Sequence, residues 1–354
     1  MSPSNSRVRY AIVGCGVIGP VHADAVAQHP SAELVGVCDI VKDRADACAA
    51  RFGGRSYADC AEMLKSERPD AVSVCTPHYN HADVAVQCLE AGAHVLCEKP
   101  LDARAEAMDR MVEAARRANR YLGGVFQHRF DPVNVTIREA IAAGMFGRVL
   151  NAGATIRCMR RDDYYRSADW RGTWAGEGGA LLINQAIHSI DMMQWLAGPV
   201  RTVCGKFANL THQGVIEAED AGSAWLEFES GALGTIEATS SSFRDFDAGV
   251  HVYGTKGSVR LATGWTNEVT SLDMESTEAA EKLRALLRAA AEEEAAPTVG
   301  KVCYGNSHGR QIGDFIEAVR DGRPPRVSAE SARHAVQIVL AVYESGRTGR
   351  AVTL

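Results

Sequence analysis

The sequence predicts an α/β protein of two domains. We expect a doubly wound parallel sheet over residues 1–126, followed by an α+β domain with an open, mostly antiparallel sheet over residues 127–354. Three observations predict this division. The chain has 354 residues, more than one ordinary hydrophobic core accommodates. Short apolar runs alternate with helical patterns only as far as residue 126. Beyond that point, several extended segments follow one another through short turns.

In the first domain, each short apolar run has the length of a buried strand. We expect these strands at Tyr10–Val13, Leu34–Cys38, Ala71–Cys75, His94–Cys97 and Tyr121–Phe126. The stretches between them have helical periodicity, which predicts helices at Val17–Gln28, Lys42–Phe52, His81–Ala91 and Ala103–Asn119. Parallel strands need crossover connections, so this alternation favours a sheet with helices on both faces.

In the second domain, short turn signals such as Ser230-Gly231 separate extended segments and predict antiparallel hairpins. The expected strands are 149–158, 200–209, 221–229, 233–240, 249–253 and 258–261. The expected helices are 133–143, 180–196, 278–296, 307–320 and 329–346, of which 278–296 reads as a solvated surface helix. Helices and strands in separate runs are typical of α+β architecture.

Composition restricts the classes of function. The net charge is −6, and the chain has no basic block typical of nucleic-acid binding and no apolar run near the ~18 residues that span a bilayer. The N-terminal segment leads directly into a strand, so we expect a cytoplasmic protein. None of the ten cysteines forms a C-x-x-C pair, which favours reduced thiols and no metal site. Patterns for zinc proteases, serine esterases and P-loop hydrolases are absent.

A glycine-rich turn provides the first functional signal. Gly14, Gly16 and Gly19 form the pattern G-x-G-x-x-G after an apolar strand and before a helix, with Val17 and Ile18 between the last two glycines. The first glycine permits the tight turn, the second lets a diphosphate approach the backbone, and the third allows close helix–strand packing. Free N–H groups and the helix dipole would then meet the diphosphate. The turn predicts a Rossmann dinucleotide site.

Asp39 indicates which dinucleotide binds. It ends the second predicted strand, 20 residues after Gly19. A carboxylate at this position accepts ribose hydroxyls and repels a 2′-phosphate, and the nearest arginine, Arg44, is more than a turn away. We therefore expect NAD rather than NADP as the cofactor.

Several further motifs resemble one family. Cys75-Thr76-Pro77 with His81, the triplet Glu98-Lys99-Pro100, and Gly178-Gly179-Ala180-Leu181 followed by Asn184, His188 and Asp191 are similar to the glucose–fructose oxidoreductase/inositol dehydrogenase (Gfo/Idh/MocA) family. The resemblance covers nearly the whole chain, and Glu-Lys-Pro is its most specific part. It implies a Rossmann domain, an open-faced sheet domain, and sheet-to-sheet packing into homodimers or homotetramers.

The resemblance also implies the site residues. It adds Thr76, Pro77, His81, Glu98 and Lys99 to the cofactor site, and it makes Lys99 and His188 the catalytic pair acting on a secondary alcohol or ketone of a polyol. Many members carry an aspartate where this chain has Asn184, so a Lys–Asp–His proton relay is in doubt. By residue type, His188 suits a base and Lys99 suits stabilisation of the alkoxide, although Lys99 with a lowered pKa would also serve as a base. Asn184 would orient substrate, and Asp191 would orient His188 or pack.

A loop rich in arginine and aromatic residues suits a sugar. Aromatic faces pack on sugar C–H surfaces, while arginine donates to hydroxyl groups. The predicted substrate residues in or near this loop are Tyr164, Trp170, Arg171, Trp174, Asn184 and His188. Arg129, Arg157, Tyr164 and His308 are the weaker substrate candidates, and a solvated loop between the domains is the alternative interpretation of this segment.

These observations support NAD-dependent oxidation or reduction of a secondary alcohol or ketone on a sugar, glycoside or inositol. One alternative is glycoside cleavage by transient oxidation and elimination on tightly held NAD. Another is a non-enzymatic NAD-sensing regulator, against which Lys99 and His188 argue because a binding module needs neither. The expected partners are a small polyol and further copies of the chain, with no nucleic acid and no membrane.

Overall fold

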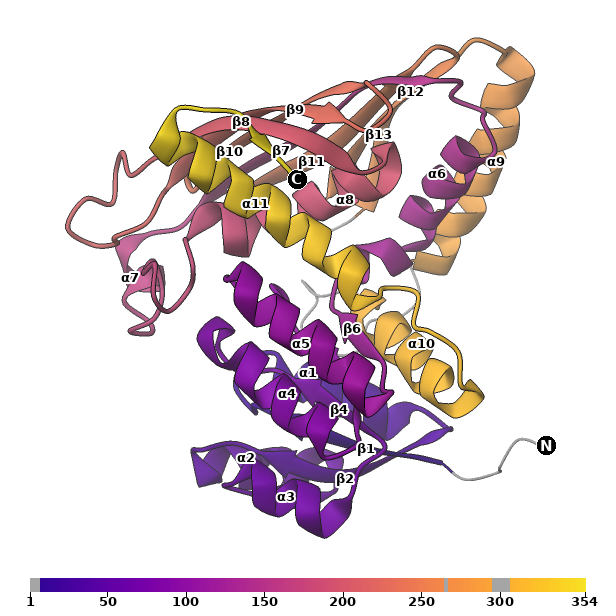
Figure 1. Ribbon diagram of the computed structural model, residues 1–354. Coiled ribbons are helices and arrows are strands. Elements are labelled where there is room, and N and C mark those ends of the chain that lie inside the picture. The colour runs from indigo at the N-terminus through magenta and orange to yellow at the C-terminus, as the bar shows by residue number, and fades with distance from the viewer. Residues whose placement is uncertain (1–6, 264–266, 295–305) are drawn as a thin grey trace. The chain divides into compact units, whose positions relative to one another are not determined.

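The computed structural model describes residues 7–263, 267–294 and 306–354 (Figure 1). The described residues form two compact units. Unit 1 contains residues 7–127 and 306–333, and unit 2 contains the remainder. The first boundary lies one residue from the one expected. Segment 306–333, which the sequence-based division placed in the second domain, groups with unit 1 because its helix completes the core of that unit.

The sheet of unit 1 has six strands in the order β3-β2-β1-β4-β5-β6, and every neighbouring pair is parallel. Its strands are β1 (Val8–Val13), β2 (Ala32–Cys38), β3 (Arg55–Tyr57), β4 (Ala71–Val74), β5 (His94–Cys97) and β6 (Leu122–Gly124). The strand order reverses between β1 and β4. The carboxyl ends of strands at such a reversal form the crevice in which doubly wound sheets bind ligands.

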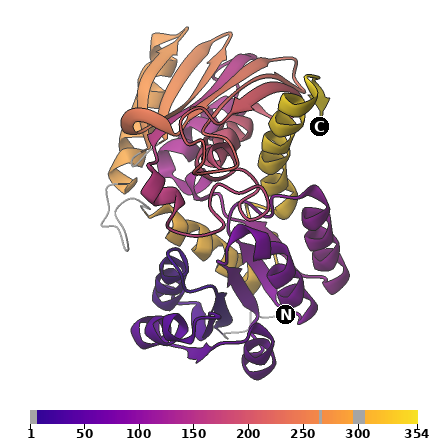
Figure 2. The same cartoon turned by 90° about the vertical axis from the view of Figure 1, so that its left-hand side faces the viewer.

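Helices cover both faces of this sheet (Figure 2). The helices of unit 1 are α1 (Gly19–Gln28), α2 (Lys42–Phe52), α3 (Cys60–Glu67), η1 (His78–Asn80), α4 (His81–Glu90), α5 (Ala105–Ala118) and α10 (Ser307–Asp321). Helix α10 packs beside α1 and contributes Ile312, Phe315 and Ile316 to the core around β1. Phe315 meets the ring of Tyr10 edge-on, with the ring centroids 6.5 Å apart.

The sheet of unit 2 has eight strands in the order β13-β12-β11-β7-β10-β9-β8-β14. Only the β7–β10 pair is parallel among its described strands, so the expected open and mostly antiparallel sheet is confirmed. The strands are β7 (Val149–Met159), β8 (Val200–Ala208), β9 (Ala221–Phe228), β10 (Leu233–Thr239), β11 (Ser241–Gly254), β12 (Gly257–Thr263), β13 (Asn267–Met274) and β14 (Val352–Thr353).

Helices α8 (Ile187–Ala197) and α11 (Ala329–Thr348) lie against one face of the unit 2 sheet, and no helix of the described chain covers its other face (Figure 1). The remaining helices of the unit are η2 (Gln127–Phe130), α6 (Pro132–Ala142), α7 (Asp162–Tyr165), η3 (Leu181–Ala186) and α9 (Thr277–Glu294). The two boundaries that lie within the described residues fall in η2 and α11.

Two differences from the sequence-based elements have clear reasons. Strand β3 and helix α3 were not expected, because β3 has one buried residue and α3 has only Met63 and Leu64 buried, too few for an apolar pattern. The single helix expected over 180–196 is a π-helical turn, η3, followed by α8. Residues 295 and 296 of the expected surface helix lie outside the described residues.

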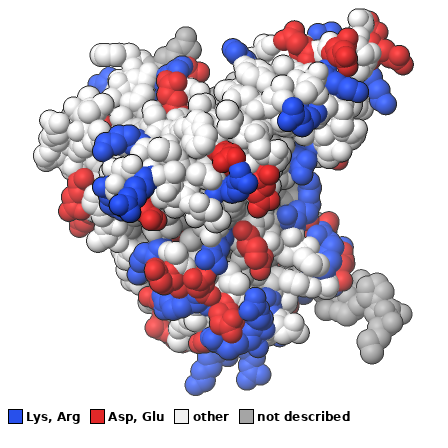
Figure 3. Space-filling model, turned by 45° about the horizontal axis from the view of Figure 1, so that its top comes forward, with Lys and Arg blue, Asp and Glu red and all other residues white. Residues whose placement is uncertain are grey.

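The charged side chains and the cysteines can be located in the structure. Acidic and basic side chains are interspersed on the face shown in Figure 3. Within the described ranges, no helix combines the length and apolarity that crossing a bilayer requires. The nine described cysteines are all free thiols; seven are buried, Cys60 is partly exposed and Cys204 is exposed. Cys303 lies outside the described residues.

Candidate active site

The glycine turn of unit 1 is shaped by close backbone contacts. A Cβ atom on Gly14 would lie 2.5 Å from the carbonyl carbon of Cys75, and the φ angle of Gly14 is +97°. A Cβ atom on Gly19 would lie 1.9 Å from the carbonyl oxygen of Gly14. Only glycine fits at either position, because a side chain would force apart the turn and the strand beside it.

The middle of the turn is open instead of crowded. A Cβ atom on Gly16 would meet nothing within 4 Å, Gly16 and Val17 are exposed, and Ile18 is half-buried. Ile18 is the N-cap of α1 but no side chain caps that helix. The positive end of the α1 dipole therefore lies beside an open turn at Gly16, where a diphosphate fits both sterically and electrostatically.

The Asp39 carboxylate is held at the end of β2 by the backbone. Its Oδ2 accepts a hydrogen bond from the Cys15 N–H (2.8 Å), and its Oδ1 accepts one from the Val41 N–H (2.8 Å). Each oxygen retains a lone pair that can accept from a ribose hydroxyl. Ile40, the next residue, is 91% exposed and gives an apolar surface beside this carboxylate.

The loop after β4 contains a polar atom that suits a bound group. The Thr76 Oγ1 is buried and has no hydrogen-bond partner among the described residues, and Pro77 is half-buried next to it. The His81 ring is directed to the backbone: its Nδ1 lies 2.7 Å from the Pro100 carbonyl oxygen and its Nε2 lies 2.8 Å from that of Thr76. Both ring nitrogens of His81 are thus engaged within unit 1, where they join the loops after β4 and β5. The expected cofactor contact of His81 remains a prediction.

Lys99 follows a buried carboxylate in a hydrogen-bonded chain. The Lys99 N–H donates to Glu98 Oε2 (3.1 Å), while Glu98 Oε1 lies 3.0 Å from His22 Nε2 and 3.7 Å from His308 Nε2. The ring of His22 continues the chain through its Nδ1, which lies 2.9 Å from Ser73 Oγ. The ligand atoms of Glu98 and the two histidines lie within 4.8 Å of one another, a spacing that would also accommodate a metal ion. His308, a predicted substrate residue, is only 4% exposed, and its observed contact with Glu98 is a buried one.

The protonation states of this chain follow from burial and hydrogen bonding. Burial would raise the pKa of Glu98, but hydrogen bonds from His22 and His308 hold it well below its ordinary value. Burial lowers the pKa of His22, and the hydrogen bond to Glu98 only partly offsets this effect. A neutral His22 that donates from Nε2 to an ionised Glu98 and accepts from the Ser73 hydroxyl at Nδ1 agrees with both directions.

In unit 2, a buried glutamate organises the start of the segment that carries Asn184 and His188. Glu219 is fully buried and accepts hydrogen bonds from the N–H groups of Ala180 and Leu182 and from the Tyr343 hydroxyl. Burial raises the pKa of Glu219 to about 7, although these hydrogen bonds oppose the shift. The glutamate thereby satisfies donors that the π-helical turn leaves at its first residues.

Tyr164 connects the aromatic loop to this segment. Its hydroxyl oxygen accepts from Arg171 Nη1 (2.6 Å), Gln185 Nε2 (2.9 Å) and Asn184 Nδ2 (3.3 Å). Asn184 also donates to the buried Glu177 carboxylate. The sequence-predicted residues Tyr164, Arg171 and Asn184 are therefore brought together, and their hydrogen-bonding groups are fixed by one another.

His188 lies in α8, half-buried, beside a second histidine. Its ring meets that of His128 edge-on, with the centroids 5.3 Å apart. The Nδ1 of His128 in turn lies 2.9 Å from the Asp131 carboxylate, and Asn267 donates to that carboxylate. His188 thus packs on a hydrogen-bonded cluster contributed by η2, the N-cap of α6 and β13.

Arg129 differs from its expected role. It is 4% exposed and forms a buried ion pair with Asp191, in which Arg129 Nε lies 2.8 Å from Asp191 Oδ2. A guanidinium in this position satisfies a buried carboxylate and is not presented to a substrate. The same ion pair shows which of the two expected roles Asp191 has. Asp191 packs against Arg129 and accepts a hydrogen bond from Gln194 instead of orienting His188.

Arg157 and Trp174 also have roles that the sequence did not predict. Arg157 projects from β7 on the face of the sheet opposite the buried residues Ile156 and Cys158, and it pairs with Glu237 on the neighbouring strand (2.7 Å). Trp174 packs against α11 and β8, with its ring centroid 5.0 Å from that of Tyr343 and 5.6 Å from that of Phe207. Both are structural contacts. Trp170, by contrast, contacts Arg171: the Arg171 guanidinium carbon lies 4.9 Å from the centroid of the Trp170 ring.

Sequence reasoning did not assign His22, Ser73, Glu177, Gln185 or Glu219 to the site. Each is polar and largely buried or hydrogen-bonded to a predicted site residue. A polar residue inside an apolar strand, such as Ser73 in β4, was the available signal. Its partners His22 and Tyr10 lie 51 and 63 residues away in the chain, so their proximity required the fold.

The glycine turn and Asp39 fit an NAD-binding Rossmann unit, the cofactor-binding unit of NAD-dependent oxidoreductases. Comparison with protein families agrees. The N-terminal model of an oxidoreductase family with an NAD-binding Rossmann fold matches residues 8–124, and the C-terminal α/β domain model of the same family matches residues 138–354. The chain therefore belongs to the Gfo/Idh/MocA oxidoreductase family.

Individual relatives match over almost their whole length. The chain is 27% identical over 357 residues to a myo-inositol 2-dehydrogenase of Thermotoga maritima, covering 98% of each. It is 29% identical over 383 residues to a D-glucoside 3-dehydrogenase of Escherichia coli K12, covering 99% of each. Among solved structures, the WlbA dehydrogenase from Bordetella pertussis in complex with NADH and UDP-GlcNAcA is 31% identical, with a TM-score of 0.88 and coverage of 99% of this chain and 98% of that one.

Proposed function

We propose that this oxidoreductase uses NAD to oxidise, reversibly, a secondary hydroxyl group of a sugar, glycoside or inositol. Two observations support the proposal: unit 1 has a turn that fits NAD, and unit 2 has a polar cluster of Tyr164, Gln185 and Asn184 in the segment that leads to His188. An array of fixed amide, phenol and guanidinium groups suits a ligand with many hydroxyls.

The residues of unit 1 fit NAD. Gly16 and the uncapped start of α1 would hold the diphosphate, Asp39 would accept from the adenosine ribose hydroxyls, and Ile40 would contact the adenine. The buried Thr76 Oγ1 would gain its missing partner from the cofactor. NAD, when bound, supplies the hydride acceptor.

The chain supplies the proton chemistry. We assign Lys99 to stabilising the negative charge that develops on the substrate oxygen, since an ammonium acts strongly in a site that excludes water. We assign His188 to accepting the hydroxyl proton, because a neutral imidazole is available near pH 7. Asn184, held by Glu177 and Tyr164, would orient the substrate through its amide. The Glu98 carboxylate fixes the backbone of Lys99 through the hydrogen bond to its N–H.

The names of the relatives support a polyol substrate. They denote a cyclitol dehydrogenase, a glucoside dehydrogenase and a dehydrogenase crystallised with a nucleotide-linked sugar acid. We extend this shared chemistry, a ring bearing several secondary hydroxyls, to the present chain.

The test is the absorbance of NADH formed by purified protein with NAD and a panel of inositols, free sugars, glycosides and UDP-GlcNAcA. We expect NADH with one group of compounds. Absence of NADH across the panel, with NAD binding shown separately, would contradict net oxidation. Product analysis of the glycosides would then show whether the chain cleaves them without net NADH, as the closed redox cycle requires.

We further propose that copies of the chain associate through the uncovered face of the unit 2 sheet. Trp225 and Leu233, on the neighbouring strands β9 and β10, are 43% and 46% exposed there. Aromatic and aliphatic side chains on an uncovered sheet face favour self-association. Light scattering should give a dimer or tetramer mass for the wild type and a smaller mass for Trp225→Glu; an unchanged mass for Trp225→Glu would contradict this interface. We place the protein in the cytoplasm, in keeping with its free thiols.

A further inference from the structure

Unit 2 contains an open cavity of about 490 Å³, lined by Met159, Arg160, Arg161, Asp163, Tyr164 and Phe243. We call it the arginine pocket. We infer that the arginine pocket binds an oxyanion, a carboxylate or a phosphate, carried by the sugar substrate. This inference rests on the proposed function, since it names the class of sugar that the same site selects.

The first argument is an excess of positive charge. The pocket has two guanidinium groups, and a third, Arg171, stacks on its Tyr164 wall, 4.4 Å from the ring centroid. In the part of the chain that the structure describes, Arg161 and Arg171 form no ion pair with a carboxylate. This concentration of arginine occurs in a chain with a net charge of −6. A guanidinium group such as that of Arg161, which pairs with no described carboxylate, is suited to binding a carboxylate or phosphate with two parallel hydrogen bonds.

The nearby carboxylates are directed elsewhere. Asp163 lines the pocket, but its Oδ1 accepts from the Tyr164 N–H (2.8 Å) within its own turn. The buried Glu177 accepts from the Gly172 N–H and from Asn184. Asp162 pairs with Arg166 (3.3 Å), which does not line the pocket. Asp162 and Asp163 are therefore engaged within the loop, and among the described residues neither pairs with Arg161, whose guanidinium is available to a ligand.

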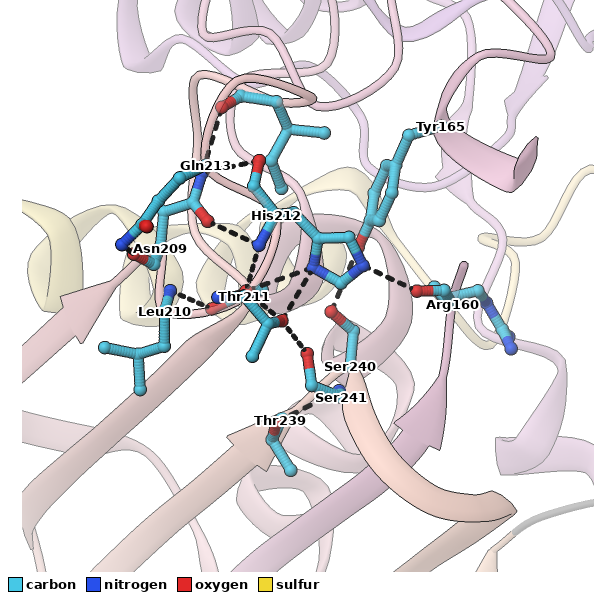
Figure 4. Close-up of polar contacts among 12 residues, drawn as sticks. Arg160, Tyr165, Asn209, Leu210, Thr211, His212, Gln213, Thr239, Ser240 and Ser241 are labelled. Carbon is cyan, nitrogen blue, oxygen red and sulfur yellow. Dashed lines mark hydrogen bonds and ion pairs between the residues drawn. The ribbon is translucent and has the colours of Figure 1, made fainter. Parts of the chain in front are cut away.

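The second argument is preorganisation (Figure 4). The carbonyl oxygen of Arg160 accepts from His212 Nε2 (2.8 Å), and His212 Nδ1 is held by Asp220 (3.0 Å). Figure 4 shows the Arg160 side chain pointing away from this cluster. The Tyr165 hydroxyl is hydrogen-bonded to Ser240 Oγ (3.0 Å), and this contact anchors the end of the helical turn α7 to the edge of the sheet. An anchored turn lets the arginines bind without first losing backbone entropy.

The third argument is the connection to the catalytic segment. Arg160 donates through Nη2 to Gln185 Oε1 (2.7 Å), and its guanidinium lies 5.3 Å from the Tyr164 ring centroid. Gln185 is adjacent to Asn184 and one helical turn from His188. An oxyanion bound in the pocket would thus set the position of the sugar ring relative to Asn184 and His188. The pocket then acts as a specificity site that favours anionic sugars over neutral ones.

The experiment compares anionic sugars with neutral ones. Binding by calorimetry in the presence of NAD, and NADH formation, are measured with D-glucose and myo-inositol, and with D-glucuronate, D-glucose 6-phosphate and UDP-glucuronate. The wild type is compared with Arg161→Gln, an exposed position that tolerates substitution, and with Arg166→Gln, a matched loss of charge on the same loop outside the pocket. We expect at least one anionic compound to bind about tenfold or more tightly than its neutral counterpart, since hydrogen bonds to charged groups are worth that much. We expect Arg161→Gln to abolish most of this preference and Arg166→Gln to keep it.

The outcomes separate this inference from the proposed function. Preference for a uronate alone identifies a carboxylate as the oxyanion, and preference for the phosphate or diphosphate compounds identifies a phosphate. Anion binding that depends on Arg161, without NADH from any compound, would uphold the pocket and overturn the proposed oxidation. NADH from neutral sugars, with no anion preference in the wild type and an unchanged KM in Arg161→Gln, would overturn the pocket and leave the oxidation standing.

Discussion

Unit 1 and unit 2 build their candidate binding positions in different ways. In unit 1 the cofactor position is made by the backbone: glycines that lack a Cβ, the uncapped start of α1, and N–H groups that orient Asp39. In unit 2 the proposed substrate position is made by side chains that hydrogen-bond to one another, with the Tyr164 hydroxyl at the centre. Backbone sites need particular residue types at fixed spacing, whereas side-chain sites need partners that only the fold brings together.

The largest expected effect is that of Lys99→Ala. Removal of the group that stabilises the developing alkoxide should lower kcat by about three orders of magnitude. NAD affinity should stay close to that of the wild type, because the backbone of unit 1 provides most of the cofactor contacts. Stopped-flow NADH formation and NAD titration measure the two quantities, with the exposed Lys65→Ala as a control. Near-normal turnover of Lys99→Ala would remove Lys99 from the mechanism.

The next largest effect separates close packing from backbone strain. Gly14 and Gly53 have φ angles of +97° and +95°, but a Cβ atom would clash only at Gly14 and meets nothing within 4 Å at Gly53. Gly53→Ala should cost about 1 kcal/mol of unfolding free energy from strain alone. Gly14→Ala should cost about 3 kcal/mol more and weaken NAD binding, since the turn must move away from Cys75. Equal losses in chemical denaturation would show that the close approach does not matter.

A buried side chain in unit 2 should make stability depend on pH. The pKa of Glu219 is raised from 4.5 to about 7 in the folded protein, so its protonated form is favoured by folding. Its contribution is complete below about pH 4.5 and is lost as pH rises through about 7, a change of about 3 kcal/mol. The stability advantage of wild type over Glu219→Gln should therefore shrink between pH 5 and pH 8. Urea titrations across this range test this, with Glu229→Gln as the exposed control; a constant difference would mean that Glu219 stays ionised.

The smallest effect is expected at Arg157. Its ion pair with Glu237 is exposed on the sheet face, where such pairs contribute about 0.5 kcal/mol or less. Arg157→Gln should leave KM and the unfolding free energy close to those of wild type. A large rise in KM would restore Arg157 to the substrate site and break the distinction between it and Arg161.

The same distinction explains what the sequence could predict. The unit 1 site could be predicted because the spacing of Gly14, Gly16, Gly19 and Asp39 is itself typical of a dinucleotide site. The parallel sheet could be predicted because short apolar runs alternate with helical patterns. Strand β3 was missed because a short edge strand buries too little to leave a pattern.

The unit 2 residues could be selected by type but not assigned to roles. Arg129 could not be recognised as the partner of Asp191, 62 residues away, nor His308 as a neighbour of Glu98 in unit 1. Trp174 has the residue type of a sugar platform and the contacts of a core residue. Partner identity depends on tertiary contacts that a single sequence does not contain.

The most direct test of the central claim follows the hydrogen itself. A polyol that reduces NAD in the panel is prepared with deuterium on its carbinol carbons and incubated with the protein and NAD, and the cofactor product is analysed by mass spectrometry. Direct hydride transfer requires one deuterium in each NADH formed. Unlabelled NADH from the deuterated polyol would contradict the account, because the hydride would then come from a source other than the secondary alcohol.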